Sequence, residues 1–533
     1  MDKRLISVVV AFSILIGCIC LRLYFISSEG TKTVSRLSNY YSEDLAELRG
    51  EIVDCKGRKL TDIDYSNIIF AKPTVKALSA LDGFVDSQIY ENISDRMKKL
   101  CAVSQNIGKT EIIENSDIVC IRINQGYNTH MAQHIIGYVN SDGDGVTGIE
   151  KAFNNVLKTN KKITARLKVN AGGNVLNGSK IEILNDVTPV NRVQLTINRD
   201  IQQIVQNAVD EYEINQGAAV VLDAKSGAVR AMVSRPDFDA DKIEKYLDDE
   251  TMPLINRSLE AYAVGSIFKI AVCIAALDCG CGDFTYNCTG SCKVNNIRFG
   301  CYNSRVHGNL DMQKALETSC NCYFINLARK IGYEKLMNTV NLLGFGQEIS
   351  LADGIVSNSG ILPNEQSLEK PGALANFSFG QGSFTASPLQ ISQMLMTVAD
   401  SGKYIKPYIV EKAIDEKGNE IFRHQVTGPV VVTSENTAKK ITKMLESVVQ
   451  KGNAIKAKPE KISAAGKTAT AQTGTFYKNG VEICNTWFGG FFPADEPEYI
   501  VVILKQGGNS GAEDCAPVFK KITDEITELT ENS

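Results

Sequence analysis

The sequence predicts an α+β protein in which an antiparallel sheet is sandwiched between helices. Two pairs of apolar strands joined by short turns, 217–239 and 486–506, are predicted to form β-hairpins at opposite ends of the C-terminal half. Helix-like segments lie between the two hairpins, and residues 516–532 are predicted to form a terminal helix. This order fits a sheet whose first and last strands come together, with helices packed on both faces.

Composition and charge are those of an ordinary globular protein. The chain has 533 residues, of which 44% are hydrophobic and 22% charged, and this length accommodates two or three domains of roughly 100–200 residues each. The formal net charge is −4, and no basic patch carries interleaved aromatic residues, so nothing indicates a nucleic-acid binder. We therefore expect no nucleic-acid partner.

The first element is an apolar segment that is long enough to cross a membrane. Residues 5–26, which begin LISVVVAFSILIGCICL, give about 22 largely apolar residues, and roughly 20 suffice to span a bilayer. Lys3 and Arg4 precede this segment, which predicts a cytoplasmic tail at 1–4 and the remainder of the chain outside the cell. A cleaved signal peptide is the alternative, but no small-x-small cleavage site follows before SSEG.

The region after the anchor mixes strand and helix patterns. RGEIVDCKGRKLTD (49–62) places a short apolar strand before a Lys-Gly turn, which indicates a hairpin. Residues 126–157 have the pattern of a strand, a glycine-rich loop and a helix, and 160–190 have that of β structure. At 193–212 a strand leads into an amphipathic helix, so a new domain is expected to begin there. The predicted domains are residues 27–190 and residues 191–533.

A serine and a lysine stand three residues apart inside the apolar run YAVGSIFKIAV (262–272). On a helix Ser266 and Lys269 point the same way, and Gly265 permits a tight entry into that helix. A serine hydroxyl becomes a nucleophile only when a base takes its proton. Burial among apolar neighbours would lower the pKa of the lysine toward the neutral form that can act as this base.

Two further short motifs follow in order. The tripeptide Ser-Cys-Asn (319–321) lies between two helix-like runs, where a loop can present a hydroxyl and an amide to a cleft. KTAT (467–470) lies in a run of small and β-prone residues that suits a strand. Its lysine and threonines are suited to bind a carboxylate and to hydrogen-bond an extended peptide beside the strand.

Each of these motifs is weak when taken alone. Ser-x-x-Lys recurs at Ser367 and Lys370, where the surroundings are polar and a proline follows directly. Ser-x-Asn recurs at Ser104 and Ser434. Together and in this order, however, Ser-x-x-Lys, Ser-x-Asn and Lys-Thr-x form the set found in penicillin-binding proteins and β-lactamases.

The chain as a whole resembles a class B penicillin-binding protein of the penicillin-binding protein 2 or sporulation type. The resemblance covers nearly the whole chain and rests, besides the three motifs, on RGEIVDCKGRKL, HIIGYV with GVTGIEKAFNNVL, LTINRDIQQ, GAAVVLDAKSGAVRAMVS, FGQGSFTASPLQ and WFGGFFP. It implies a five-stranded transpeptidase sheet in residues 191–533. It also implies an elongated N-terminal pedestal domain of the dimerisation type in residues 27–190.

The resemblance assigns a role to each motif residue. Ser266 would be the nucleophile that is acylated, and Lys269 would be its base. Ser319 and Asn321 would line the cleft, with the serine relaying a proton toward the leaving amine. The implied activity is that of a D,D-transpeptidase, which needs no cofactor for its chemistry.

The third motif and the backbone would bind the substrate. Lys467 and Thr468 would bind the substrate carboxylate, and the N–H groups of Ser266 and Thr470 would form the oxyanion hole. Ser266 would attack the penultimate D-Ala carbonyl of a peptidoglycan stem peptide and release D-Ala, and an amine of a second stem peptide would then take the acyl group. β-Lactams would mimic the first step and leave Ser266 blocked.

The motifs depart from the family's pattern in small ways. Val264 and Ile267 replace the usual proline and threonine around Ser266, and Ala469 stands where the third motif usually has glycine. A methyl group at Ala469 is expected to narrow the channel beside the strand and to disfavour bulky β-lactam side chains. Asn198 replaces a common aspartate, and Ser387 replaces a threonine before proline. None of these changes removes a catalytic atom.

A cluster of cysteines lies between the first two motifs. Cys288, Cys292, Cys301 and His307 stand on one stretch, CTGSCKVNNIRFGCYNSRVHG (288–308), and three thiolates with one imidazole suit tetrahedral zinc. Disulfides, natural for an exported domain, and reduced thiols are the alternatives. If zinc binds, we expect it to fix the loop beside the cleft. Cys279, Cys281 or Cys320 could replace one of these four ligands.

Other activities remain compatible with the motifs. A D,D-carboxypeptidase would let water deacylate Ser266, and a catalytically minor scaffold would serve a membrane glycosyltransferase. The resemblance itself implies such a glycosyltransferase as a partner in cell-wall synthesis and cell shape. Along with the predicted anchor, it also implies a single-pass membrane protein with an extracellular catalytic domain.

Overall fold

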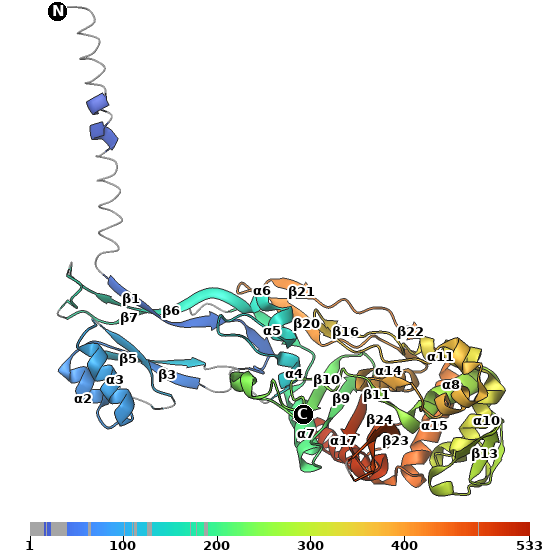
Figure 1. The fold of residues 1–533 in the computed structure, drawn as a ribbon. Coiled ribbons are helices and arrows are strands. Elements are labelled where there is room, and N and C mark those ends of the chain that lie inside the picture. Colours follow the sequence, from blue (N-terminus) through green and yellow to red (C-terminus); the bar gives the residue numbers. More distant parts are fainter. Residues whose placement is uncertain are drawn as a thin grey trace, which may run out of the picture. The chain divides into compact units, whose positions relative to one another are not determined.

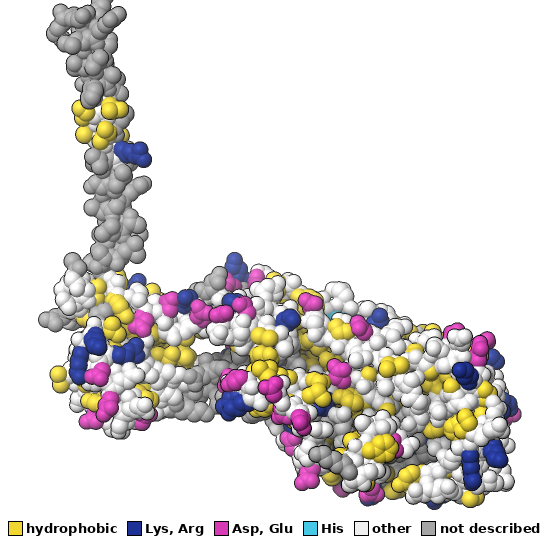
Figure 2. Space-filling model, viewed as in Figure 1, with side chains coloured by type: hydrophobic (Ala, Val, Ile, Leu, Met, Phe, Trp, Pro, Cys, Tyr) yellow, Lys and Arg dark blue, Asp and Glu magenta, His cyan; other side chains and the backbone are white. Residues whose placement is uncertain are grey.

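The computed structural model describes most of the chain, in two compact units. The described residues are 15–17, 19–22, 40–61, 65–100, 102–108, 110, 115–124, 131–170, 172–176, 178–185, 190–477 and 479–532. Most of the predicted anchor, residues 5–26, lies outside these ranges, and none of the helices within them is long and apolar enough to span a bilayer. Figure 2 shows acidic and basic side chains interspersed on the visible surface, in keeping with the small net charge.

The first unit combines the described residues within 1–49, 64–125 and 159–188. It contains two three-stranded sheets and two small apolar cores, one of which takes side chains from both sheets. The first sheet has the order β1 (Tyr40–Arg49), β6 (Lys158–Lys168), β7 (Glu182–Asn185), and the second β4 (Val103–Asn106), β3 (Tyr65–Ala71), β5 (Ile118–Asn124). Helices α2 (Val75–Leu81) and α3 (Ser87–Met97) contribute to the core of the second sheet.

The second unit takes in two segments that precede the predicted domain boundary. Residues 50–63 and 126–158 group with 189–533, whereas we expected them within the domain 27–190. The reason is burial, because Ile52 and Leu60, together with Ile149, are fully buried in the main core of the second unit. Arg58 adds ion pairs to Asp54 and Asp200, both at 2.7 Å.

A four-stranded sheet joins these early segments to the rest of the second unit. Its order is β2 (Glu51–Val53), β8 (Arg192–Leu195), β20 (Val410–Ile414), β21 (Glu420–Arg423). β2 runs parallel to β8, while β20 is antiparallel to both of its neighbours. Helices α4 (Gln133–Ile136), α5 (Gly148–Ala152) and α6 (Asn154–Leu157) complete the N-terminal contribution to this unit.

The main sheet has five strands, all antiparallel, as predicted. Its order is β10 (Val229–Arg235), β9 (Gly217–Asp223), β25 (Tyr499–Gln506), β24 (Glu482–Phe492), β23 (Ala465–Phe476). Both predicted hairpins are confirmed, and β9 pairs with β25, so the two ends of the domain's sequence meet at the centre of the sheet. In Figure 1 the green strands β9 and β10 accordingly lie beside the red strands near the C-terminus.

Helices cover both faces of this sheet. Residues 217–222 and 500–504 are buried without alternation, which is the pattern of strands that are covered on both sides. Helices α7 (Arg199–Glu211) and α17 (Ala516–Glu531) contact each other and strands of the sheet. A second group consists of α8 (Lys269–Asp278), α14 (Pro388–Ala399) and α15 (Glu435–Lys451). In this group α15 contacts both other helices, and α14 and α15 contact the sheet. The predicted terminal helix is thus confirmed.

Short elements make up the rest of the second unit. The remaining helices of the second unit are η1 (Ala240–Lys245), η2 (Gly265–Phe268), η3 (Tyr302–Ser304), α9 (Met312–Glu317), α10 (Asn321–Ile331), α11 (Tyr333–Leu342), α12 (Glu365–Leu368), α13 (Pro371–Phe377), η4 (Ile455–Ala457) and α16 (Gly511–Asp514). Five two-stranded ribbons accompany them: β11 (Tyr262–Ala263) with β18 (Thr385–Ala386), β12 (Tyr286–Cys288) with β15 (Gly308–Leu310), β13 (Ser291–Val294) with β14 (Ile297–Gly300), β16 (Ser350–Ala352) with β17 (Ile355–Val356), and β19 (Lys403–Tyr404) with β22 (Val430–Val431).

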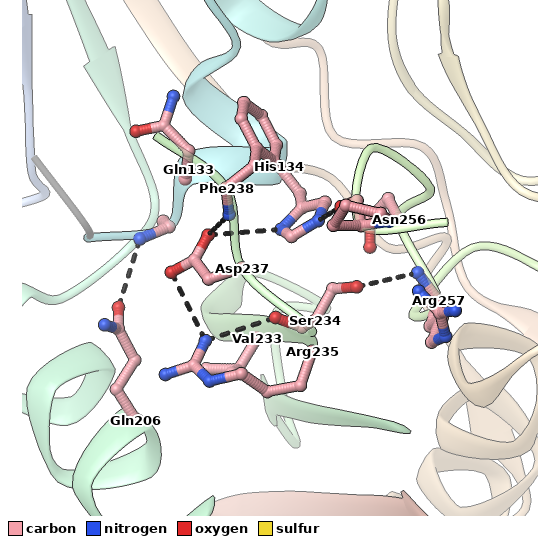
Figure 3. A network of polar contacts seen from close by, with 12 residues as sticks. Gln133, His134, Gln206, Val233, Ser234, Arg235, Asp237, Phe238, Asn256 and Arg257 are labelled. Carbon is pink, nitrogen blue, oxygen red and sulfur yellow. Dashed lines mark hydrogen bonds and ion pairs between the residues drawn. The ribbon is translucent and has the colours of Figure 1, made fainter. Parts of the chain in front are cut away.

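A polar network around His134 ties α4 to the segment that precedes the Ser-x-x-Lys motif (Figure 3). His134 is almost fully buried, and its Nε2 donates a hydrogen bond to the Pro253 carbonyl at 2.7 Å. Burial lowers the pKa of His134 to about 4, so the ring is neutral at physiological pH. Asp237 faces the other ring nitrogen at 3.9 Å. His134 is therefore a structural residue of the second unit.

Candidate active site

The nucleophile candidate stands where a short 3₁₀ turn leads into helix α8. Ser266 lies in η2 and is partly exposed, while Lys269 is the first residue of α8 and is 0% exposed. The predicted placement of both residues at a helix N-terminus is confirmed. Gly265 has a φ of +68°, and a Cβ there would lie 3.0 Å from the Thr470 carbonyl oxygen. The glycine therefore allows the serine to approach β23 closely.

Lys269 connects the first motif to the second. Its Nζ donates hydrogen bonds to the Ser319 carbonyl at 2.8 Å, the Ser319 hydroxyl at 3.2 Å and the Asn321 Oδ1 at 2.8 Å. Ser319 adopts a left-handed backbone with a φ of 53°, a conformation that costs a non-glycine residue about 1–3 kcal/mol. This turn between α9 and α10 brings both the carbonyl and the hydroxyl of Ser319 to the amine.

Burial makes Lys269 suitable as a base. It lowers the pKa of Lys269 to about 8, because an ammonium without water around it is unfavourable. Within the described residues no carboxylate pairs with Lys269, and only negative charge on nearby cysteines, Cys320 first, raises its pKa against this cost. The Ser266 hydroxyl makes no hydrogen bond to any described residue, and is free to bond a substrate or the neutral amine.

The third motif lies on the edge strand of the main sheet, against the first. Lys467 is 0% exposed, and its Nζ donates to the Thr468 carbonyl at 3.0 Å. Burial, followed by the nearby Lys269 charge, lowers the pKa of Lys467 well below its ordinary value. Two buried amines with no carboxylate among their described partners form a site that favours an anionic ligand.

Two further residues near the motifs are buried. Trp487 is fully buried, and its Nε1 donates to the Ala263 carbonyl at 3.0 Å, which holds the strand that leads to Ser266. Ala469 is 3% exposed and belongs to the main core. Its methyl group therefore adds little surface to the cleft, contrary to the expectation that it narrows the channel.

The second Ser-x-x-Lys pattern lacks every feature of the first. The Ser367 hydroxyl donates to the Asn364 carbonyl at 2.7 Å, so it caps its own helical turn. Lys370 is exposed and keeps the hydration that stabilises an ammonium. The pair Ser367 and Lys370 therefore offers neither a free hydroxyl nor an amine that is driven toward neutrality.

The cysteine cluster lies directly beside the second motif. Cys288, Cys301, His307 and Cys320 place one donor atom each within 4.8 Å of one another. The pairing of β12 with β15 brings Cys288 next to His307, whose Nδ1 lies 3.4 Å from the thiol. Cys292 lies on β13 outside this group, so the predicted set is corrected in one member. Cys320, the middle residue of Ser-Cys-Asn, is the fourth donor.

The sequence indicates Cys320 only as one of three cysteines that could replace a predicted ligand. The Ser-x-Asn pattern treats its middle residue as a spacer, yet this residue is the N-cap of α10, 0% exposed. Its sulfur lies 3.6 Å from that of Cys301. Hydrogen bonds from Cys320 and Cys322 lower the pKa of Cys301, which favours a thiolate there.

Comparison with known proteins identifies a family and relatives that this chain resembles. The family described as "Penicillin binding protein transpeptidase domain" matches residues 217–524. The stage V sporulation protein D of Bacillus subtilis is 27% identical over 94% of this chain and 81% of its own length. The peptidoglycan D,D-transpeptidase MrdA of Acinetobacter baumannii is 26% identical over 72% of this chain and 64% of its own length.

A solved structure extends the likeness in fold to nearly the whole chain. A structure entitled "Structural coordination of polymerization and crosslinking by a peptidoglycan synthase complex" contains a chain with a TM-score of 0.71 to this one and 22% sequence identity. The match covers 98% of this chain and 97% of the other.

An accessible serine, a buried lysine one helical turn away and a lysine on the facing edge strand define a serine-dependent acyltransferase of the kind that penicillin acylates. The three motifs that follow one another in the sequence lie together in the structure. With the matched domain covering more than half of the residues, the chain belongs to the penicillin-binding protein transpeptidase family, in its class B.

Proposed function

We propose that this chain cross-links peptidoglycan stem peptides through an acyl-enzyme formed on Ser266. The observation that carries the proposal is the position of the Lys269 amine. It is buried, hydrogen-bonded to Ser319 and Asn321, and one helical turn from the serine. A base that is held in place and inclined toward its neutral form is what a serine nucleophile requires.

The first step is acylation. Neutral Lys269 takes the proton of Ser266 as the hydroxyl oxygen attacks the carbonyl carbon of the penultimate D-Ala. The N–H groups of Ser266 and Thr470 face the developing oxyanion. The C–N bond then breaks, and the proton passes from Lys269 through the Ser319 hydroxyl, 3.2 Å away, to the departing amine of D-Ala.

The second step transfers the acyl group. An amine of a neighbouring stem peptide attacks the ester carbonyl, Lys269 accepts the proton that this amine loses, and the Ser266 oxygen leaves and recovers a proton. A new amide bond replaces the ester, so no net proton or electron is consumed. Before acylation, Lys467 and Thr468 bind the terminal carboxylate of the donor, which supplies the negative charge that the two buried amines lack.

The open edge of β23 aligns the donor peptide. β23 is the last strand of the five-stranded sheet and has β24 on one side only. Its other edge can pair with an extended peptide, as in β-augmentation. The approach of Gly265 to Thr470 places Ser266 beside this edge.

Covalent labelling tests the assignment of the nucleophile. The full-length protein is incubated with a fluorescent penicillin, and wild type is compared with Ser266→Ala and Ser367→Ala. We expect label to be lost only in Ser266→Ala, since β-lactams acylate the same hydroxyl. Label that persists in Ser266→Ala contradicts the proposal. If active wild type releases free tetrapeptide and forms no cross-links, the protein is the D,D-carboxypeptidase of the first alternative. If Ser266→Ala still supports cross-linking in a complex with the glycosyltransferase, the protein is the scaffold of the second.

The cellular setting is part of the same proposal. Residues 5–26 anchor the chain in the cell membrane with the catalytic unit outside, and a membrane glycosyltransferase supplies the glycan strands. The likeness to a chain from a structure that couples polymerisation to cross-linking supports this partner. A variant that keeps the native cysteines and has one added surface cysteine on the second unit tests the orientation, since a membrane-impermeant maleimide should label it above the level of wild type in intact cells when it lies outside, and no added label would contradict this orientation.

We also propose that the cysteine cluster holds one structural zinc ion. Zinc–sulfur bonds of about 2.3 Å in a tetrahedron place sulfurs about 3.8 Å apart. Here the Sγ atom of Cys301 lies 3.7 Å from that of Cys288 and 3.6 Å from that of Cys320. His307 completes a Cys₃His donor set. When bound, the ion would lock the turn that presents Ser319 and Asn321, and no catalytic step involves it.

Metal analysis tests the zinc proposal independently of activity. Elemental analysis of the purified full-length protein should find one zinc per chain, and Cys301→Ser should lose it while the control Cys279→Ser retains it. A mass two hydrogens lower without zinc would show a disulfide instead. Full thiol titration without zinc would show reduced thiols, and either outcome overturns the proposal.

A further inference from the structure

The hairpin that extends the catalytic edge strand carries exposed aromatic side chains at its tip. Phe476 and Tyr477 are 60% and 47% exposed, and Val481 is 57% exposed. Tyr477 and Val481 are neighbours across the turn, because the Tyr477 N–H donates to the Val481 carbonyl at 2.8 Å. The central part of the sheet has its large side chains buried, so this tip is an exception that asks for an explanation.

The tip is held in a fixed position. Tyr477 packs at Gly507, where a Cβ would collide with the phenol oxygen, and that oxygen lies 3.5 Å from the Gly507 carbonyl. The Glu482 carboxylate accepts hydrogen bonds from the Gln472 amide and from the Gly474 N–H, the latter at 3.1 Å. Phe476 pairs with Glu482 across the two strands, so an aromatic ring and a carboxylate lie on the same face of the hairpin before any ligand arrives, which reduces the entropy lost on binding.

The direction of the bound donor peptide leads to this tip. In the proposed reaction the terminal carboxylate lies at Lys467 and Thr468, and the scissile carbonyl lies at Thr470. The rest of the stem peptide must therefore continue along β23 toward higher residue numbers, past Gln472 to Phe476. This step rests on the proposed function.

The distance along the strand matches the length of a stem peptide. Thr470 pairs with Thr486, and Phe476 pairs with Glu482, so Phe476 and Tyr477 lie four and five positions from Thr470 along β24. At about 3.4 Å per residue this is roughly 13–17 Å. Four peptide residues and the lactyl group that joins them to the glycan amount to about five backbone units, or roughly 16–18 Å when extended.

We propose that the tip of the β23–β24 hairpin binds the amino sugar to which the donor stem peptide is attached. The ring of Phe476 offers an apolar face to the C–H face of a pyranose, and the Glu482 carboxylate, on the same side of the hairpin, can accept hydrogen bonds from sugar hydroxyl or acetamido N–H groups. Aromatic rings suit this task because they present a rigid surface with few torsions to fix. The subsite makes the enzyme recognise a glycan-linked peptide rather than a free one.

Kinetics with two donors test the proposal. Full-length protein in detergent is given a stem pentapeptide, or the same pentapeptide carried on its disaccharide, and the rate of D-Ala release is measured for each. We expect wild type to prefer the disaccharide donor, and Phe476→Ala and Glu482→Ala each to reduce this preference about 3- to 10-fold through KM, with unchanged rates on the free pentapeptide. Phe476→Tyr should retain the preference, and Phe84→Ala, at a 46% exposed phenylalanine in the first unit, should behave as wild type.

Penicillin acylation separates this proposal from the proposed function. Normal labelling of every variant shows that fold and nucleophile are intact, so an absent or unaltered preference for the disaccharide overturns the sugar subsite alone. A hairpin variant that instead loses binding to a glycosyltransferase or to lipid vesicles, with normal donor kinetics, assigns the tip to that partner and also overturns it. Failure of wild type to label overturns the proposed function itself.

Discussion

The protonation state of Lys269 should control the rate of acylation. Burial lowers the pKa of Lys269 to about 8, and only the neutral amine can accept the proton of Ser266. The neutral fraction is then about one tenth at pH 7 and about nine tenths at pH 9. We expect the first-order acylation constant, measured by stopped-flow fluorescence at saturating penicillin, to rise about 10-fold over this interval with a midpoint near pH 8.

Saturating ligand is needed because a second lysine also titrates. The pKa of Lys467 is lowered by burial, and loss of its charge at high pH should weaken carboxylate binding without slowing the chemical step. Lys269→Arg is the matched control, since a guanidinium stays charged at all accessible pH values. It should lower acylation by at least about 100-fold at every pH. A first-order constant that is flat or falls between pH 6.5 and 9.5 in wild type would refute the role of Lys269 as the base.

Three further perturbations test other parts of the site. Gly265→Ala adds a Cβ 3.0 Å from the Thr470 carbonyl oxygen at a φ of +68°, and should slow penicillin acylation at least about 10-fold with a normal circular dichroism spectrum; an unchanged rate would show that the close approach is unimportant. Trp487→Phe removes the bond to the Ala263 carbonyl, and should lower the free energy of unfolding by about 1–3 kcal/mol in urea titrations, whereas no loss would mean that water replaces the indole. Treatment with a strong zinc chelator should lower the Tm by about 5 °C or more in wild type but leave Cys301→Ser unaffected, and equal shifts in both proteins would count against the metal.

Much of the main sheet could be predicted from the sequence. The uninterrupted apolar runs of β9 and β25, each followed or preceded by a turn, indicate strands that are buried on both faces, and the structure pairs them at the centre of the sheet. The terminal helix and the helix after residue 198 follow from equally strong periodicity. Such strands and helices can be predicted from the local sequence because tertiary packing favours the same local structure.

Membership of segments in the two units was harder to predict. Residues 50–63 and 126–158 precede the predicted boundary, yet Arg58 pairs with Asp200 and β2 lies along β8. Such pairing joins residues about 140 positions apart in the sequence. Nothing local to residues 50–63 reveals which unit supplies their partner strand.

The catalytic motifs were identified by chemical context rather than by spacing. Ser266 and Ser367 have the same pattern, and the structure separates them by burial of Lys269 against exposure of Lys370, as their apolar and polar neighbours indicate. The role of Cys320 as a metal ligand is harder to predict, because a ligand inside a catalytic tripeptide has no spacing signal of its own. Its place in the cluster depends on how the β12–β15 ribbon folds back onto α10.

Mass spectrometry can detect the acyl group of a stem peptide on Ser266 directly, when the protein is quenched within seconds of mixing with a stem pentapeptide and then analysed by peptide mapping. We expect an added mass equal to the pentapeptide without its terminal D-Ala, located on Ser266 and absent in Ser266→Ala. This adduct should be converted to cross-linked product when an acceptor amine is added. An adduct on another residue, or cross-linking with no adduct on Ser266 at any time, would contradict the role of Ser266.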